Sequence, residues 1–478
     1  MTADANHNQV VTFGCRLNAY ESEAIKEALK NSDQKNLIVF NSCAVTSDAE
    51  RDLRQAIRRT KRENPQAKIV VTGCAAQIDP QKYAKMEEVD LVLGNVEKSK
   101  AESYSKTDSS SLAQSAEDLV SLNSESNLTR SSSLRLKDDE LVDVDHRDHK
   151  DRIFFDTKKS SANFLTPDET AKIKVNDIMS VRDTAPQLVS YFEDKTRAFL
   201  EIQNGCNHRC TFCIIPFGRG NSRSVAFGEI VAQVKKMVAS GHKEVVLTGV
   251  DISGYGEDLA APITLSQMLK RLLAMVPELP RLRLSSIDVA EIDEDFFELL
   301  KTEPRLMPYL HLSVQSGDDT ILKRMKRRHN RQQILDFCAK ARQIRPDMTF
   351  GADIIAGFPT ETDEMFENSL NLISEVGIIF NHIFPYSKRD GTPAAKMPQV
   401  DGKIIKARAK LLREAGSAEL QKFLQKQIGK KLNVIVEKDG IGRAENFIEV
   451  KISSKQKAGE ILSVKASSVE ENFLIAEM

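Results

Sequence analysis

Residues 197–213, RAFLEIQNGCNHRCTFC, decide how the rest of the chain is interpreted. The first six residues predict a strand, and the three cysteines that follow have the spacing C-x3-C-x2-C. A structural zinc site is closed by four protein ligands, and a cluster that only carries electrons usually takes four cysteines. Cys206, Cys210 and Cys213 supply three, so a four-iron cluster held here would keep one iron open to a small chelating ligand. The alternative is a zinc knuckle completed by His208 or by a distant residue.

This cysteine spacing resembles the signature of radical S-adenosylmethionine (SAM) enzymes. The resemblance implies that the open iron binds the amino and carboxylate groups of SAM. It also implies that the reduced cluster cleaves SAM to a 5′-deoxyadenosyl radical. Iron-sulfur potentials reach roughly −700 mV, which suits such a reductant. Cys206, Cys210 and Cys213 would then be the catalytic cysteines.

The same resemblance implies four further contacts to SAM. Phe212 would lie beside the adenine, Gly249 near the amino group, and Gln315 and Gly357 near the ribose and adenine. The acidic residue expected beside Gly249 is absent or replaced by Asp251. A glycine that ends a strand is also a common turn residue, so these contacts are expectations by analogy.

Composition limits the classes of function. The chain has 478 residues, enough for two or three domains, and a formal net charge of −1, so nucleic-acid binding would depend on local basic patches. No apolar run approaches the roughly 20 residues needed to cross a bilayer, and the first ten residues do not read as a signal peptide. We therefore expect a cytoplasmic protein without membrane contact. Its seven cysteines would be reduced there, which favours metal binding or catalysis over disulfides.

The first 98 residues alternate between predicted strands and helices. The predicted strands cover residues 10–15, 37–43, 68–74 and 90–94. The first three end on Cys15, Cys43 and Cys74, which are separated by 28 and 31 residues, about one strand-helix-strand crossover each. Because the carboxyl ends of parallel strands share one edge of a sheet, these cysteines should converge. The alternative is three independently buried cysteines.

Three stretches of this region are similar to the amino-terminal domain of the methylthiotransferases. They are GCRLNAYE at 14–21, NSCAVT at 41–46 and VTGCAAQ at 71–77. The resemblance implies that Cys15, Cys43 and Cys74 bind a second, auxiliary four-iron cluster, which handles the sulfur to be inserted. The first two motifs are closest to the MtaB branch of the family, which modifies tRNA.

The middle of the chain predicts six strand-helix units. Strands are expected over residues 198–202, 244–247, 282–286, 309–314, 350–355 and 378–384, with amphipathic helices such as 230–238, 265–273 and 332–344 between them. Six units make an incomplete parallel barrel, with chemistry at the carboxyl ends of its strands. The cysteine loop follows the first strand, where such a site belongs. Cys338 lies on the apolar face of a helix and is interpreted as a core residue.

The tail changes to short strands over residues 432–437, 442–450 and 461–464, which predict a small antiparallel barrel. It resembles the TRAM domain, an RNA-binding module found at the end of methylthiotransferases. Phe447 stands where that family often has tyrosine, so it could stack on a base. The alternative is a domain that only packs on the central barrel.

The predicted fold class is therefore α/β, with four segments. They are a methylthiotransferase amino-terminal domain over 7–98, a low-complexity linker over 99–190, a radical SAM core with a partial (β/α)6 barrel over 191–421, and a TRAM-like domain over 424–478. The linker is predicted to be largely disordered because it is serine-rich and densely charged. Residues 173–181 could nevertheless dock on a neighbouring domain.

Two groups of basic residues could contact RNA phosphates. One shares a face of a helix predicted over 46–63 and comprises Arg51, Arg54, Arg58 and Arg62. The other comprises Lys323, Arg324, Lys326, Arg327 and Arg328. Charged helix faces are also commonly just solvated, so both interpretations stay open at this point.

Taken together, the resemblances indicate a tRNA methylthiotransferase. They imply that it replaces the C2 hydrogen of N6-threonylcarbamoyladenosine, beside the anticodon, with a methylthio group. Two [4Fe-4S] clusters and two SAM molecules would be used, one SAM as methyl donor and one as radical source. The implied partners are tRNA, an electron donor such as flavodoxin or ferredoxin, and a sulfur source. Alternatives are the same chemistry on isopentenyl-adenosine in tRNA or on a ribosomal-protein aspartate, and a non-catalytic zinc RNA-binding protein.

Overall fold

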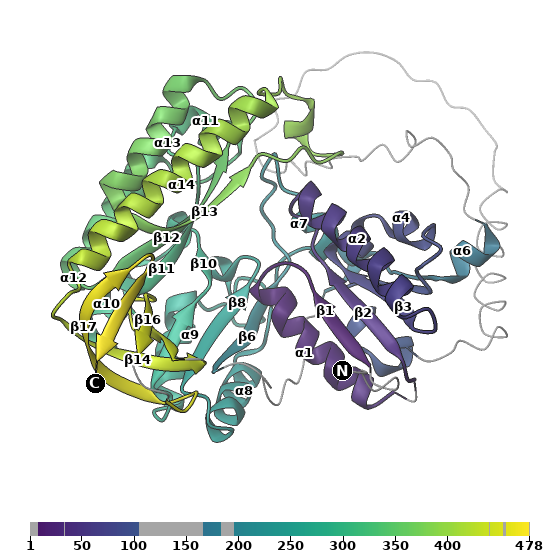
Figure 1. Cartoon of the computed structure of the whole chain (residues 1–478), viewed down its shortest axis with the longest axis horizontal. Coiled ribbons are helices and arrows are strands. Elements are labelled where there is room, and N and C mark those ends of the chain that lie inside the picture. The colour runs from purple at the N-terminus through teal and green to yellow at the C-terminus, as the bar shows by residue number, and fades with distance from the viewer. Residues whose placement is uncertain are drawn as a thin grey trace, which may run out of the picture. The chain divides into compact units, whose positions relative to one another are not determined.

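The structure is a computed structural model that describes residues 8–32, 34–104, 166–182, 196–438, 440–452 and 456–477. Three groups of secondary structure follow one another along the chain: an amino-terminal parallel sheet with helices, a larger barrel of strands and helices, and a small carboxyl-terminal barrel (Figure 1). Most of the predicted linker, namely its residues 105–165 and 183–190, lies outside the described residues. Among the described helices, none is long and apolar enough to cross a membrane.

The amino-terminal sheet has five parallel strands that hydrogen-bond in chain order. They are β1 (Gln9–Thr12), β2 (Leu37–Ser42), β3 (Lys68–Gly73), β4 (Leu91–Leu93) and β5 (Ile173–Lys174). All six residues of β2 are buried, as expected for a parallel strand covered on both faces. The four predicted strands are confirmed, and their carboxyl ends share one edge.

Helices follow the first three strands of this sheet. They are α1 (Arg16–Lys30), α2 (Ser47–Glu63), α3 (Cys74–Ile78) and α4 (Pro80–Ala84), and two 3-10 turns follow, η1 (Glu97–Ser99) and η2 (Ala101–Tyr104). Thr46 caps α2, since its hydroxyl oxygen accepts a hydrogen bond from Ala49 N at 3.2 Å. The Glu50 carboxylate, in the first turn of α2, pairs with Lys82 Nζ at 2.6 Å.

Part of the segment predicted as linker completes this sheet. Residues 166–182 form α6 (Pro167–Ala171), β5 and the 3-10 turn η4 (Ile178–Ser180). Ile173 pairs with Val92, and Ile173 and Val175 pack on the apolar core of the domain. The sheet edge therefore recruits a segment that the sequence analysis placed beyond the domain, because its apolar residues can be buried there.

The central barrel has six parallel strands, as predicted. They are β6 (Arg197–Asn204), β8 (Glu244–Gly249), β9 (Arg281–Leu284) with its continuation β10 (Ser286–Ile287), β11 (Tyr309–Gln315), β12 (Thr349–Ala356) and β13 (Ile378–Pro385). They form two hydrogen-bonded sheets, β7-β6-β8-β9 and β10-β11-β12-β13. The short β7 (Arg223–Ser224) runs antiparallel to the end of β6.

Helices connect these strands. They are α7 (Ile215–Arg219), α8 (Phe227–Ala239), α9 (Leu265–Met275), α10 (Glu294–Thr302), α11 (Asp319–Arg324), α12 (Arg331–Ile344) and α13 (Asp363–Val376), with 3-10 turns η5 (Ile252–Gly254), η6 (Val289–Glu291) and η7 (Pro393–Lys396). Strand residues such as Val246 and Leu312 pack in one core with helix residues such as Ile230. Cys338 is 2% exposed in this core, which confirms its interpretation as a core residue.

Helix α14 (Gly402–Gln425) packs along β13 and leads into a closed five-stranded barrel. Its strands are β14 (Lys431–Lys438), β15 (Ile441–Ala444), β16 (Glu449–Ile452), β17 (Ile461–Glu470) and β18 (Phe473–Glu477). The predicted small barrel is present, and its strand pairs are antiparallel except β16–β18, which is parallel. The strand predicted over 442–450 is split by a turn in which Phe447 has a φ of 71°, outside the range of strand residues.

This turn places Phe447 against the central barrel. Its ring stacks on Tyr309, with centroids 4.4 Å apart and planes 12° apart, and Arg443 lies over it at 4.3 Å. Arg283 of β9 donates to Ala444 O at 2.9 Å, and Thr349 Oγ1 donates to a neighbouring carbonyl of the same turn. Tyr309 and Thr349 begin their strands, so the turn docks at the amino-terminal end of the barrel. The ring of Phe447 is thus occupied within the protein, contrary to the interpretation that it stacks on a base.

The central barrel is incomplete between β6 and β13, and the amino-terminal domain contacts both sides of this opening. Helix α1 packs against β6. On the other side, Ser47 Oγ lies 2.9 Å from Ser387 Oγ, and Glu50 Oε1 accepts from Arg389 Nη1 at 2.6 Å. Ser387 and Arg389 follow β13. The amino-terminal domain therefore spans the gap that two missing strands would fill.

Candidate active site

The loop with Cys206, Cys210 and Cys213 is irregular and is held by long-range hydrogen bonds. Cys206 N donates to Gly220 O at 3.1 Å, and Cys213 N donates to Cys210 O at 3.0 Å. Between the cysteines, Thr211 N donates to Met325 O at 3.1 Å, at the end of α11. The loop is therefore positioned by the barrel rather than by its own secondary structure.

Two thiols of this loop, those of Cys206 and Cys213, lie where burial disfavours the thiolate unless a positive charge is added. Burial, and then the Asp251 carboxylate, raise the pKa of Cys206, and burial raises the pKa of Cys213 to about 12. Bare thiols would stay protonated here, and iron would supply the positive charge that stabilises thiolates. Arg327 Nη1 donates to Cys210 Sγ at 3.6 Å and is itself held by Asp288 at 2.7 Å.

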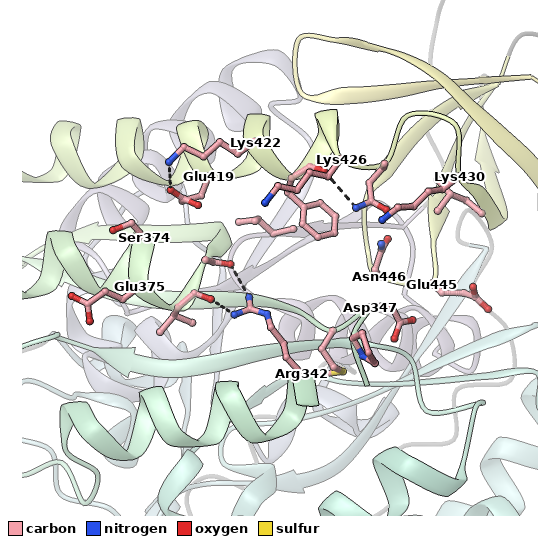
Figure 2. A pocket seen from close by; sticks show the side chains of 18 of the residues that line it. Arg342, Asp347, Ser374, Glu375, Glu419, Lys422, Lys426, Lys430, Glu445 and Asn446 are labelled. Atoms are coloured by element: carbon pink, nitrogen blue, oxygen red, sulfur yellow. Dashed lines mark hydrogen bonds and ion pairs between the residues drawn. The ribbon is translucent and has the colours of Figure 1, made fainter. Parts of the chain in front are cut away.

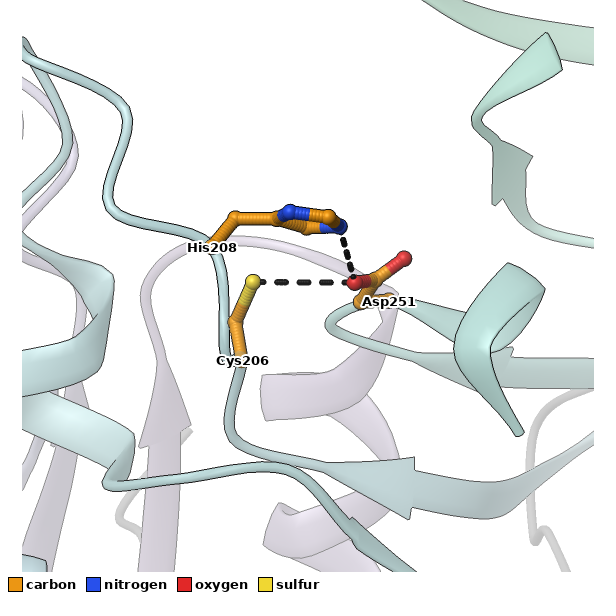
Figure 3. Close-up of side chains that lie close together, drawn as sticks. All are labelled: Cys206, His208 and Asp251. Carbon is orange, nitrogen blue, oxygen red and sulfur yellow. Dashed lines mark hydrogen bonds and ion pairs between the residues drawn. The ribbon is translucent and has the colours of Figure 1, made fainter. Parts of the chain in front are cut away.

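His208 does not complete a single-metal site with the three cysteines. Its Nε2 lies 2.9 Å from Asp251 Oδ2 and 3.2 Å from Glu291 Oε1, while Cys206 Sγ donates to the same Asp251 oxygen at 3.7 Å (Figure 3). Within the described part of the chain, neither cysteine triad has its three sulfur atoms all within 4.8 Å of one another. One zinc ion would need sulfur atoms about 3.8 Å apart, whereas the cysteines of a four-iron cluster bind different irons. The donor set fits the cluster better than the zinc knuckle.

The second triad comes from three different elements of the amino-terminal sheet. Cys15 precedes α1 and is exposed, Cys43 follows β2, and Cys74 begins α3; both of the latter are buried. Burial and the neighbouring Cys74 raise the pKa of Cys43 to about 11, with a smaller effect from Cys15. The predicted convergence of these cysteines at one sheet edge is therefore present in the fold. Asn18 Oδ1 accepts from Cys15 Sγ at 3.3 Å and orients the exposed member.

Helix α7 joins the two triads. It begins two residues after Cys213, and a Cβ added at Gly218 would lie 3.2 Å from Cys74 Cβ. The next residue, Arg219, pairs with both oxygens of Glu21 at 2.7 and 3.1 Å. Lys98 Nζ lies 2.7 Å from Glu21 Oε2.

This ion-pair network is almost completely buried, and the arginine and lysine hold the pKa of Glu21 at about 2 although burial acts in the opposite direction. Burial lowers the pKa of Arg219, but Cys74, Glu21 and Cys15 together raise it above its usual value. A buried guanidinium is therefore part of the surroundings of the second triad.

The four residues predicted to contact SAM all lie near the carboxyl ends of the strands, but with different surroundings. Phe212 packs edge-on against Phe358, with ring centroids 6.4 Å apart. Gln315 ends β11 with a φ of 66°. A Cβ at Gly249 would lie 2.6 Å from Gln203 O, and one at Gly357 would lie 2.5 Å from Ile405 Cγ1. Both glycines therefore have a packing reason that needs no ligand.

Sequence reasoning missed Gln203, which links the cysteine loop to the end of β8. Its Oε1 accepts from Val250 N at 3.0 Å and from Asp251 N at 2.8 Å, while Nε2 donates to Gly205 O at 2.7 Å. The side chain is buried on β6, two residues before the loop begins. A buried glutamine in an apolar strand was the available signal, since such a group needs partners.

The predicted basic cluster divides into internal and surface residues. Arg327 is bound to Asp288 and Cys210, and Arg324 donates to Thr360 Oγ1 at 2.8 Å, so neither is free to face RNA. The exposed members are Lys323, Lys326 and Arg328. On α2, the exposed members are Arg51, Arg58 and Arg62.

A cavity of about 570 Å³, whose lining residues include no cysteine, lies between α12, α13, α14 and the carboxyl-terminal barrel (Figure 2). Charges of both signs line it, including Arg342, Glu419, Lys422 and Lys426. Arg342 donates to Val376 O, which helps to hold α12 against the end of α13. Because its walls carry no cysteine and lie on the docking side of the small barrel, this cavity is not the catalytic centre.

Comparisons with known proteins agree with the fold. The Radical SAM superfamily matches residues 200–373, which contain the cysteine loop, part of β6 and four further parallel strands of the barrel. A family described as Uncharacterized protein family UPF0004 matches residues 7–94, which contain the other three cysteines. The barrel with its three-cysteine loop is thus a radical SAM domain, a class that uses SAM and a [4Fe-4S] cluster.

Full-length relatives define the family more closely. The chain is 48% identical to a threonylcarbamoyladenosine tRNA methylthiotransferase MtaB of Rickettsia prowazekii, over 98% of this chain and 96% of the relative. It is 33% identical to the MtaB of Aquifex aeolicus, over 95% and 98%. A tRNA-2-methylthio-N(6)-dimethylallyladenosine synthase of Rickettsia rickettsii is 30% identical over 98% of both chains. The chain belongs to the radical SAM methylthiotransferases.

Proposed function

We propose that this protein is a tRNA methylthiotransferase that replaces the C2 hydrogen of N6-threonylcarbamoyladenosine with a methylthio group. The observation that carries the proposal is the 48% identity, along nearly the full length of both chains, to a relative named for that reaction. The relative named for the dimethylallyl substrate is 30% identical over the same extent, which favours the threonylcarbamoyl substrate. The relatives described above are named for tRNA, which favours tRNA over a ribosomal protein.

In this proposal, Cys206, Cys210 and Cys213 hold the cluster that binds SAM, and Cys15, Cys43 and Cys74 hold a second [4Fe-4S] cluster. When bound, the first cluster and SAM supply radical chemistry that can break the unactivated C2–H bond, and the second carries the sulfur that is inserted. A second SAM molecule is the methyl donor.

The residues of the chain orient and shield these groups. Arg327, fixed by Asp288, donates to Cys210 Sγ and offsets negative charge on the cluster side. Gln203 holds the cysteine loop and the end of β8 in one arrangement. Phe212, Gly249, Gln315 and Gly357 are proposed to contact SAM, the glycines through close approach of their backbone.

The partners follow from the same chemistry. The exposed arginines of α2 and the exposed Lys323, Lys326 and Arg328 are proposed to meet tRNA phosphates. Cluster reduction needs an electron donor such as flavodoxin or ferredoxin, and repeated turnover needs a sulfur source.

Mass spectrometry of tRNA nucleosides tests the proposal directly. Cells that lack the protein should lose 2-methylthio-N6-threonylcarbamoyladenosine, and a plasmid copy should restore it. A Cys206→Ala copy should not. If the nucleoside is unchanged while the dimethylallyl derivative is lost, the chemistry stands and the substrate assignment is wrong.

A further inference from the structure

Three neighbouring strands of the barrel carry a hydrogen-bonded group that the proposed mechanism does not use. The group consists of His311 on β11, Asp353 on β12 and His382 on β13. His311 Nε2 lies 3.0 Å and His382 Nδ1 3.3 Å from the same oxygen, Asp353 Oδ1. Tyr309 extends the chain, because its hydroxyl lies 2.8 Å from His311 Nδ1. We call these four side chains the lumen group.

The lumen group is a built site. A Cβ added at Gly351 would lie 2.4 Å from the Tyr309 hydroxyl and 2.6 Å from His311 Nδ1, so the fold keeps that space for the pair. Solvent exposure increases from His311 to His382 along the hydrogen-bonded group. The side chain of His311 is 2% exposed, that of Asp353 22% and that of His382 56%. Burial alone would raise the pKa of Asp353, but hydrogen bonds from both histidines hold it below its usual range. The exposed end of the lumen group is therefore the His382 imidazole, which lies beside the ionised Asp353 carboxylate.

The lumen group lies on the strands that carry the proposed SAM contacts. His311 is four residues before Gln315 on β11, and Asp353 is four residues before Gly357 after β12. Four residues of a strand span about 13 Å, and side chains two residues apart face the same way. The group is thus below the catalytic end and faces the same side.

A cation reaches the lumen group from the second cysteine triad. Arg16, directly after Cys15, has its Cζ 5.7 Å from the Phe447 ring centroid, and that ring stacks on Tyr309. Arg16 forms no ion pair with another described residue. A partly buried guanidinium without a carboxylate partner is available to bind an anionic ligand.

We propose that Arg16, Asp353 and His382 bind the N6 substituent of the substrate adenine and select a threonylcarbamoyl group over an apolar one. This inference rests on the proposed function. The threonylcarbamoyl group carries a carboxylate for Arg16 and N–H and O–H donors for Asp353, and His382 can donate or accept. A dimethylallyl group offers none of these and would leave a buried charge without a partner.

The test compares two anticodon stem-loop RNAs that differ only in the N6 group, threonylcarbamoyl or dimethylallyl, with the reconstituted full-length enzyme. Arg16→Gln should lower kcat/KM for the threonylcarbamoyl RNA roughly 100-fold, as expected for loss of one partner of a desolvated charge pair. His382→Leu should lower this kcat/KM by a smaller factor. In both variants, the ratio of kcat/KM for the two RNAs should shift in favour of the dimethylallyl RNA. Lys270→Gln, an exposed lysine of α9, is the matched control and should change neither value.

A substrate change keeps the test independent of folding. With the unaltered enzyme, an RNA in which the threonyl carboxylate is replaced by an amide should have a kcat/KM about 100-fold lower than the threonylcarbamoyl RNA. Arg16→Gln should not lower kcat/KM for the amide RNA any further. Formation of 5′-deoxyadenosine without RNA should be unchanged in both variants.

Three results separate the possibilities. If Arg16→Gln lowers kcat/KM by the same factor for both RNAs, Arg16 supports the second triad and the inference is wrong. If purified protein holds one divalent ion that His382→Leu removes, the lumen group is a metal site and the inference is also wrong. If the unaltered enzyme never modifies the threonylcarbamoyl RNA, it is the proposed function that fails.

Discussion

Cys206, Cys210 and Cys213 lie within eight residues of one loop, whereas Cys15, Cys43 and Cys74 follow three separate strands. The first triad is partly exposed and is held by hydrogen bonds from distant parts of the barrel, such as Thr211 N to Met325 O. The second has two buried members at the edge of a sheet. Local spacing thus defines one ligand set and tertiary folding the other, so the two should respond differently to substitution.

The largest expected effects come from the cysteines themselves. Cys206→Ala should abolish SAM cleavage, because two cysteines cannot hold the reactive cluster, while about four iron atoms per chain remain. Cys74→Ala should also keep about four iron atoms per chain. It should still cleave SAM but form no methylthio product. Iron and sulfide analysis with chromatography of 5′-deoxyadenosine measures both. SAM cleavage that survives in Cys206→Ala would reverse the assignment of the two triads.

The glycines before two of the cysteines extend the comparison. Gly205 has a φ of 72°, and a Cβ there would lie 1.9 Å from Asn221 O; the values at Gly73 are 93° and 2.4 Å from Ser42 O. Both Gly205→Ala and Gly73→Ala should cost about 1–3 kcal/mol of stability. Gly205→Ala should also abolish SAM cleavage, whereas Gly73→Ala should disturb the second cluster and leave SAM cleavage intact.

Gly228→Ala is the control for these substitutions, because it lies in α8 with nothing within 4 Å of an added Cβ. It should be neutral or slightly stabilising, since alanine has the higher helix propensity. Cluster absorbance and chemical denaturation report both effects. Full SAM cleavage in Gly205→Ala would show that the cysteine loop can bind its cluster with a different backbone conformation at residue 205.

The link between the two regions can be broken at Arg219. Arg219→Met would leave Glu21 with only Lys98 as a buried partner, so the free energy of unfolding should fall by about 3–5 kcal/mol. Arg331→Met, which removes a partly exposed pair with Glu375, should cost less than about 1 kcal/mol. Denaturant titration measures both. Equal small losses would mean that the buried network does not stabilise the contact between the regions.

Glu201, beside this network, gives a pH dependence. Burial, and then Glu21, raise its pKa from 4.5 to about 7, and its Oε2 has no hydrogen-bond partner among the described residues. The folded state therefore binds the proton more tightly than the unfolded state, and stability from this group falls as pH rises from about 4.5 to 7. Glu201→Gln should remove this fall, on the order of 3 kcal/mol, and be more stable than the unaltered protein at pH 8. Chemical denaturation of both proteins at pH 5 and pH 8 measures this difference. If Glu201→Gln changes the free energy of unfolding equally at both pH values, the pKa of Glu201 is not raised.

The smallest effect is expected on the surface near the second triad. Arg58, exposed on α2, pairs with Glu88 only at 3.7 Å and is proposed to meet a tRNA phosphate. Arg58→Ala should weaken tRNA binding modestly and reduce the salt dependence by about one phosphate contact, without changing SAM cleavage. Filter binding at several salt concentrations measures this. An unchanged salt slope, as expected for Lys270→Gln, would assign the helix face to solvent.

The sequence predicted most of the architecture because its signals are local. Six strand-helix units, the parallel amino-terminal sheet and a small terminal barrel were all readable from periodicity, and the structure has each of them. The failures were also local in cause. Phe447 sits in a positive-φ turn inside a stretch that alternates like a strand, and Ile173 joins a sheet from a segment of linker-like composition.

For the candidate site, the sequence by itself determined the six clustered cysteines, since both spacing and strand ends are written in the chain. Only the tertiary structure decided what surrounds them. Arg219 and Glu21 are 198 residues apart, and His382 meets Asp353 only because β12 and β13 are neighbours. Periodicity indicates which face of an element is buried but not which distant charge lies opposite, because ion pairs and hydrogen bonds depend on the packing of whole elements.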